Sequence, residues 1–188
     1  MRALVLDSSM AGFDALLERR RRSGLGRLDE VWGGVLHVIP APSLAHALIA
    51  QQLAELLGPL AREAGLACAM HEFNLGSSEA DFRVPDGGLL RPGARGTWLP
   101  TAALVVEIVS PGDETWEKLP FYAAHQVDEV LIVDPRERTV DWLALNKGDY
   151  REVSHSSLVE LDAERLTARM RWPSGDPDTS TPTPVQNL

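Results

Sequence analysis

The strongest constraint on the fold of this chain comes from two uninterrupted apolar segments with a helical segment between them. Residues 102–109 read AALVVEIV, residues 130–134 read VLIVD, and residues 115–125 have the spacing of a helix. A strand that is apolar on both of its faces belongs to a sheet that helices cover on both sides, because a solvated face would alternate with polar residues. The sequence therefore predicts an α/β fold with a strand–helix–strand unit at its centre.

The remaining segments predict two further helices and several shorter strands. Helices are expected at residues 12–22 and 44–64, where large apolar residues recur at helical spacing. Strands are expected at 28–32, 35–39, 66–75, 80–84 and 88–90, followed by a Gly- and Pro-rich loop at 91–100 and a final hairpin at 139–145 and 150–153. Strands in which apolar and polar residues alternate favour antiparallel pairing. The expected architecture is therefore a mixed sheet flanked by helices.

Length and composition are typical of one domain with a tail. The chain has 188 residues, which is an ordinary size for a single domain. From residue 173 onward the sequence reads PSGDPDTSTPTPVQNL and is almost free of large apolar side chains. We therefore expect a single domain over residues 1–172 and a disordered Pro/Ser/Thr-rich tail over residues 173–188.

Composition also excludes several classes of protein. A single cysteine, Cys68, rules out an internal disulfide and a multi-cysteine zinc site. No apolar run reaches the ~20 residues that cross a bilayer. The four apolar residues before Asp7 are too few for a secretory signal, so we expect a cytoplasmic protein without a membrane segment.

The overall charge is acidic. The chain has 27 Asp and Glu residues against 18 Lys and Arg residues, a formal net charge of −9. Proteins that hold nucleic acid mainly through its phosphates are usually basic. The four consecutive arginines at 19–22 are interpreted as the solvated C-terminal turn of a helix, where cations are favoured.

Glu107 is the one charged residue inside the first apolar strand. Burial of an unpaired carboxylate costs several kcal/mol, so Glu107 must be paired, bound to a metal or placed at an exposed strand end. Asp86 stands at a turn between two strands, and Lys118 lies on the helix that follows Glu107. Two carboxylates beside an ammonium group suit a hard cation such as Mg²⁺, although ordinary salt bridges explain this spacing equally well.

Three sequence motifs carry a resemblance to a known family. They are RVPD at residues 83–86, LVVEIVSPGDETWEKLPFY at 104–122 and VDEVLIVDP at 127–135. Together with Glu30, Gly33 and the segment from Pro42 to His46, they resemble the Uma-type putative restriction endonuclease family, which belongs to the PD-(D/E)XK nuclease superfamily. The resemblance covers roughly residues 28–150. It implies a restriction-endonuclease-like core with a curved mixed sheet.

The resemblance also implies roles for individual residues. Asp86 and Glu107 would be the catalytic acids and, with the backbone carbonyl of Ile108, would hold Mg²⁺ or Mn²⁺. The superfamily places its lysine two residues after the acid, where this chain has Val109. Lys118 on the neighbouring helix would therefore be the third catalytic residue. Second-tier members of the site would be Glu30, His46 and Tyr122.

Three functions are compatible with these residues. The first is a metal-dependent endonuclease that hydrolyses phosphodiester bonds, acts as a homodimer and takes nucleic acid as its partner, with DNA favoured over RNA by the family. The second is a catalytically silent homo-oligomeric binding or regulatory protein that keeps the nuclease fold, which the acidic charge favours. The third is a doubly wound nucleotide-binding domain that uses Asp134, and the lack of a G-x-G-x-x-G motif or a P-loop disfavours it.

Overall fold

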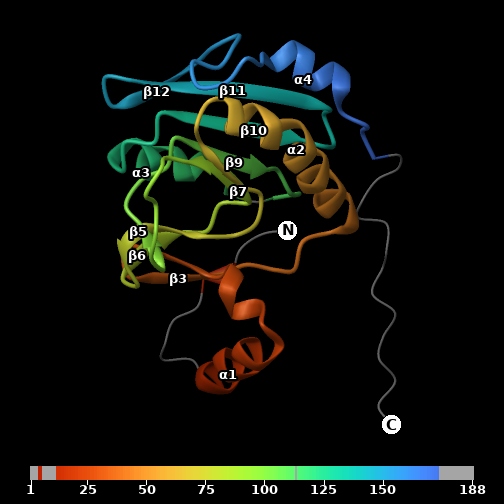
Figure 1. The fold of residues 1–188 in the computed structure, drawn as a ribbon. Coiled ribbons are helices and arrows are strands. Elements are labelled where there is room, and N and C mark those ends of the chain that lie inside the picture. Colours follow the sequence, from red (N-terminus) through yellow and green to blue (C-terminus); the bar gives the residue numbers. More distant parts are fainter. Residues whose placement is uncertain (1–3, 6–11, 113, 174–188) are drawn as a thin grey trace.

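Two mixed sheets form the framework of the molecule (Figure 1). The structure is a computed structural model that describes residues 4–5, 12–112 and 114–173. In spatial order, sheet A contains β1 (Leu4–Val5), β3 (Val35–Val38), β2 (Glu30–Trp32), β6 (Asp81–Arg83), β5 (Asn74–Ser78) and β8 (Trp98–Leu99). Sheet B contains β12 (Asp149–Glu152), β11 (Thr139–Asn146), β10 (Glu129–Asp134), β9 (Leu104–Ile108), β7 (Gly87–Leu90) and β4 (Ala67–Ala69).

Helices surround this framework. They are α1 (Phe13–Ser23), α2 (Leu44–Glu63), α3 (Leu119–Ala124) and α4 (Ala163–Arg169), with the 3-10 helices η1 (Leu25–Leu28) and η2 (Trp116–Lys118). The long helix α2 contacts β4 and β9 of sheet B, and α1 lies at the opposite end of the molecule, beyond sheet A (Figure 1). In the part of the chain that the structure describes, none of the helices combines the length and apolar character needed to cross a membrane.

The predicted strand–helix–strand unit is present. Strands β9 and β10 pair in parallel, from Leu104 opposite Glu129 to Ile108 opposite Val133. On one face of these strands, Val106 and Leu131 pack with α2 and α4, and on the other face Val105 packs with Tyr122 of α3. Both faces of sheet B are therefore covered, which explains why β9 and β10 are apolar throughout.

Some boundaries differ from those that the sequence predicts. The single strand expected at 66–75 is two strands, with β4 in sheet B and β5 in sheet A. Residues 66–75 contain no glycine or proline, so the sequence carries no turn signal where the chain passes from one sheet to the other. The loop at 91–100 contains β8, which extends sheet A by parallel pairing with β5. Helix α4 was not predicted. The expected helix at 115–125 consists of η2 and then α3.

The extent of the domain stays a prediction. The segment expected to form a disordered tail lies outside the described residues, except for Pro173.

Candidate active site

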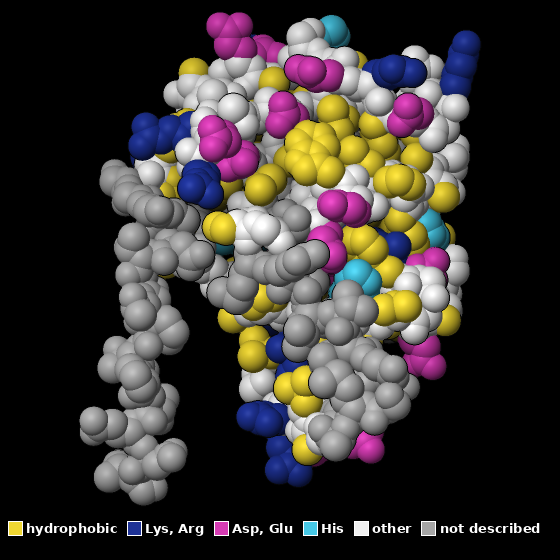
Figure 2. All heavy atoms as spheres, turned by 180° about the vertical axis from the view of Figure 1, so that it is seen from behind, with side chains coloured by type: hydrophobic (Ala, Val, Ile, Leu, Met, Phe, Trp, Pro, Cys, Tyr) yellow, Lys and Arg dark blue, Asp and Glu magenta, His cyan; other side chains and the backbone are white. Residues whose placement is uncertain are grey.

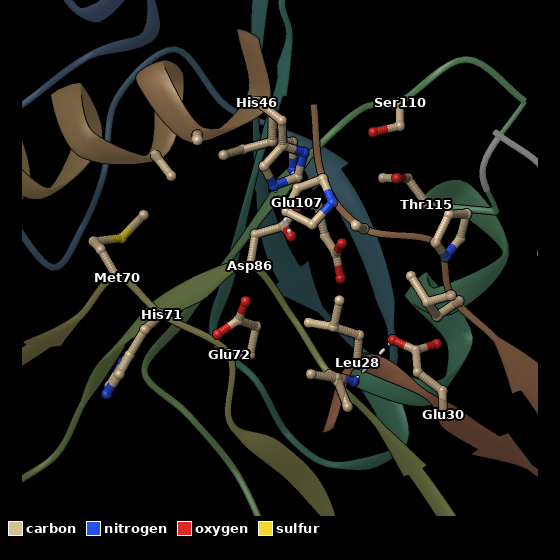
Figure 3. Close-up of a pocket in the computed structure, with 18 of the residues that line it drawn as sticks. Leu28, Glu30, His46, Met70, His71, Glu72, Asp86, Glu107, Ser110 and Thr115 are labelled. Carbon is tan, nitrogen blue, oxygen red and sulfur yellow. Dashed lines mark hydrogen bonds and ion pairs between the residues drawn. The ribbon is translucent and has the colours of Figure 1, made fainter. Parts of the chain in front are cut away.

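Asp86, Glu107 and Lys118 lie together although they are far apart in the sequence. All three line one cavity of about 340 Å³, in which Figure 3 labels Asp86 and Glu107. The register of sheet B explains the first pair, because Gly87 of β7 is opposite Val106 of β9 and the preceding Asp86 is thus brought beside Glu107. The backbone N–H of Ile108 donates to Asp86 Oδ2 at 2.7 Å and fixes the carboxylate there.

The carboxylate of Glu107 has two partners in the protein interior. Lys118 Nζ lies 3.2 Å from Glu107 Oε1 and 3.1 Å from Oε2. The hydroxyl of Tyr122, which is fully buried, donates to Glu107 Oε1. Lys118 and Tyr122 are four residues apart on η2 and α3, so one helical turn presents both side chains to the same carboxylate.

Glu30 is the second carboxylate on Lys118. Its Oε1 lies 3.0 Å from Lys118 Nζ and also accepts the backbone N–H of Val84 at 2.8 Å. Its Oε2 accepts the indole N–H of Trp32 at 2.7 Å. Lys118 therefore joins Glu30 of sheet A to Glu107 of sheet B.

His46 completes the set of residues that the resemblance assigned. It lies in the first turn of α2, which Ser43 caps by accepting the backbone N–H of His46 at 3.2 Å. The ring atom Nε2 of His46 is 3.0 Å from Asp86 Oδ1. The structure thus brings together Glu30, His46, Asp86, Glu107, Lys118 and Tyr122, while their catalytic roles stay predictions.

The electrostatics of the cavity follow from burial and from an excess of carboxylates. Burial raises the pKa of Glu107 to about 8, against the effects of Lys118 and Tyr122, and the charges of Asp86 and Glu30 raise it further. Burial lowers the pKa of Lys118, but Glu107 and Glu30 outweigh this effect, so its pKa is raised. Lys118 thus stays an ammonium ion, and its one positive charge faces the carboxylates of Glu30, Asp86 and Glu107.

This donor set fits a divalent cation. Among the described residues, no three His, Cys, Asp or Glu side chains are grouped as a complete metal site. Mg²⁺ needs no such group, since it binds through one or two carboxylates and keeps several water molecules. Asp86, Glu107 and the carbonyl of Ile108 supply oxygen donors, and the uncompensated negative charge favours a cation beside them.

Sequence reasoning missed several residues that support the site. Trp32 holds Glu30 and stacks on His37, with ring centroids 4.3 Å apart, and His37 Nδ1 lies 2.9 Å from Glu114 Oε2. The guanidinium carbon of Arg83 lies 4.3 Å from the centroid of the Trp32 ring and 4.0 Å from that of Phe121. The position of Arg83 in the RVPD motif was the one signal available, because the stacked pairs join segments far apart in the chain.

Comparison with solved structures agrees with the fold. A crystal structure described as a putative nuclease belonging to DUF820 from Anabaena variabilis ATCC 29413 superposes with a TM-score of 0.60 at 16% identity, over 74% of this chain and 89% of that one. This likeness shows the fold and confirms the predicted restriction-endonuclease-like α/β class. A DrdV–DNA complex matches at a TM-score of 0.35 and 17% identity, over 55% of this chain and 9% of that chain.

The sequence comparison identifies the family directly. A search of the curated proteins gave no significant match. Residues 17–172 match the Uma2 family, whose description is putative restriction endonuclease, and this span includes every residue assigned to the candidate site. The chain therefore belongs to the Uma2 putative restriction endonuclease family.

Proposed function

We propose that the protein is a metal-dependent endonuclease that hydrolyses phosphodiester bonds in DNA. The observation that carries the proposal is the convergence of Asp86, Glu107 and Lys118 on one cavity. Membership in the Uma2 family supports the same reaction class. The homodimer, the preference for DNA over RNA and the cytoplasmic location stay predictions.

The residues of the cavity have different roles in hydrolysis. Asp86, Glu107 and the carbonyl of Ile108 would hold Mg²⁺ or Mn²⁺, which when bound supplies Lewis acidity and lowers the pKa of a coordinated water. In the reaction, a water oxygen bonds to phosphorus while the bond from phosphorus to the leaving sugar oxygen breaks. The proton lost by the water goes to solvent, and solvent protonates the leaving oxygen.

Lys118 acts through its charge. Because its pKa is raised, it stays protonated and cannot accept the proton of the water. It stabilises the negative charge that builds up on the phosphoryl oxygens. Glu30 and Tyr122 are positioning residues, since Glu30 orients Lys118 and Tyr122 orients the carboxylate of Glu107.

A catalytically silent binding or regulatory protein is the second candidate. The observation in its favour is that Glu107 already has a cation and a hydroxyl donor as partners, so the buried carboxylate is accounted for without a metal. The net charge of −9 also favours this candidate.

Cleavage of supercoiled plasmid in Mn²⁺ separates the two candidates. The isosteric variants Asp86→Asn, Glu107→Gln and Lys118→Met should each lower the cleavage rate by about 10²–10³-fold, the usual effect of removing one group that stabilises a transition state. Glu152→Gln, an exposed carboxylate on β12, serves as the matched control and should retain the rate of the unaltered protein.

Two results would contradict the proposal. Cleavage that survives both Asp86→Asn and Lys118→Met would come from a different site or from a contaminating enzyme. If calorimetry shows that Glu107→Gln binds Mn²⁺ as tightly as the unaltered protein, Glu107 is not a metal ligand.

A further inference from the structure

The cavity has an apolar wall beside its charged residues. Helix α2 contributes Ala47, Ala50 and Ala54, which share one face of the helix because they are three and four residues apart. Met70 and Pro40 extend this wall. In Figure 3, Met70 and α2 lie on one side of Asp86, and Glu30 lies on the other.

An apolar wall of this kind needs an apolar part of the substrate. Phosphates and sugars are strongly hydrated, and placing them against alanine and methionine side chains would remove water without replacing its hydrogen bonds. A nucleobase has flat faces, and enzymes that extrude a base hold it between aromatic or apolar side chains. The part of a nucleic acid that fits the wall is therefore a base next to the scissile phosphate.

Size limits how such a base can enter. The cavity volume of about 340 Å³ is at the lower end of the range for sites that enclose one small ligand. A base inside a duplex is stacked between its neighbours and paired, and an enzyme reaches it only after it leaves the stack. Leaving the stack is least costly for a base that has no partner.

We propose that the apolar wall of the cavity receives one unpaired nucleobase, so that the protein prefers DNA containing an unpaired nucleotide over continuous duplex. This inference rests on the proposed function, since the hydrolytic residues define where the scissile phosphate lies. Gln51 and Glu72 also line the cavity and offer hydrogen-bonding groups to the edge of the base.

The charge of the cavity supports the same preference. Besides Glu30, Asp86 and Glu107, the lining includes Glu72 and Glu114, against the one ammonium of Lys118. Such a surface repels the phosphates of either kind of DNA, so phosphate contacts contribute little to the affinity. Contacts to a base carry no charge penalty, so they can supply the affinity that phosphate contacts do not.

Fluorescence anisotropy with three labelled DNA duplexes tests the inference, in a buffer with Ca²⁺ in place of Mg²⁺. One duplex is continuous, one has a single extra thymidine in one strand, and one has an extra abasic site at the same place. The duplex with the extra thymidine should bind about tenfold more tightly than either of the others. The abasic duplex separates insertion of a base from simple flexibility of the DNA.

Variants that fill the wall should remove the preference. Ala54→Leu narrows the cavity and should reduce the tenfold preference to about twofold or less. Ala47→Phe also narrows the cavity and changes an exposed residue, so it can replace Ala54→Leu in the test if that variant fails to fold. Glu63→Leu places the same new side chain at an exposed position near the end of α2, outside the cavity lining, and should keep the preference.

The outcomes separate this inference from the proposed function. Equal affinity for the thymidine and abasic duplexes, or a preference that survives both filling variants, would overturn the base site. Preferential binding of the thymidine duplex without cleavage of any DNA in Mn²⁺ would overturn the hydrolytic function and leave the base site standing. Cleavage of continuous duplex, together with equal binding of all three duplexes, would overturn the base site and leave the hydrolytic function standing.

Discussion

Glu107 shows how a carboxylate can be kept in the interior of a sheet. Its side chain is almost fully buried, yet Lys118 supplies a countercharge and Tyr122 a hydrogen bond. Each partner lowers the cost of the negative charge, but burial still outweighs them and raises the pKa to about 8. Near neutral pH, Glu107 is therefore protonated in most of the molecules, and a proton competes with any cation at this carboxylate.

Metal affinity should consequently rise with pH. Below pH 8 most Glu107 carboxyls are protonated, and each molecule must release that proton before the metal binds. We expect the dissociation constant of Mn²⁺, measured by calorimetry, to fall roughly tenfold per unit between pH 6 and pH 7.5 and to level off above pH 8. Glu107→Gln should bind weakly at every pH, and a pH-independent affinity in the unaltered protein would show that Glu107 is not the group that titrates.

At the scale of elements, a second buried carboxylate ties the C-terminal segment to sheet B. Glu129 of β10 accepts the indole N–H of Trp142 on β11 at 2.8 Å and the hydroxyl of Ser156 at 2.6 Å. Its other oxygen accepts the backbone N–H of Ser157 at 2.7 Å and the hydroxyl of the same serine at 2.6 Å. Four donors thus converge on one carboxylate, and they hold the segment before α4 against the sheet.

Replacing Glu129 should weaken the attachment of the segment before α4 to sheet B. In Glu129→Gln, the amide group is a donor that faces two other donors, so about two of the four hydrogen bonds are lost. We expect the free energy of unfolding, measured in urea, to fall by about 3 kcal/mol, since a hydrogen bond to a charged group contributes roughly 1.5–3 kcal/mol. Glu152→Gln, an exposed site on β12, should change it by less than about 0.5 kcal/mol. A loss below about 1 kcal/mol in Glu129→Gln would mean that the network does not hold the segment.

At the scale of the whole molecule, the candidate site is the junction of the two sheets. Sheet A supplies Glu30, sheet B supplies Glu107, and Lys118 joins them. The cavity at this junction is lined by five Asp or Glu residues against one lysine. On the face in Figure 2, Asp and Glu side chains are scattered over the body, and Lys and Arg side chains occur at its upper edges as well as at the lower end, where α1 lies. Two arginines of α1 are paired within the helix, because Glu18 forms ion pairs with both Arg21 and Arg22.

This charge distribution predicts a weak dependence of DNA binding on salt. A protein that contacts six to ten phosphates loses about 10³–10⁵-fold in affinity between 50 and 200 mM salt. With one lysine in the site and a net charge of −9, we expect about two phosphate contacts and a loss of about tenfold over the same range. Anisotropy titrations at several salt concentrations measure this slope, and a loss near 10³-fold would reveal a broad basic contact surface.

Features that depend on local burial can be predicted from the residue pattern alone. The apolar segments at 102–109 and 130–134 specified β9 and β10, because strands buried on both faces must be apolar throughout. Within the first segment, Glu107 stood out for the same reason, since a buried carboxylate requires partners. The motif resemblance then selected Asp86 and Lys118 from many other charged residues, and the structure places both beside Glu107.

Contacts between segments that are distant in the chain could not be predicted in this way. The division of residues 66–75 between two sheets, the stacking of Arg83 on Trp32 and Phe121, and the link from Lys118 to Glu30 all join residues whose sequence separation says nothing about their distance. The apolar wall of the cavity depends on the same fact, because α2 and β4 meet through packing rather than through a local pattern. The order of apolar and polar residues along the chain indicates which side chains are buried. Sheet register and helix packing then determine which buried side chains contact one another.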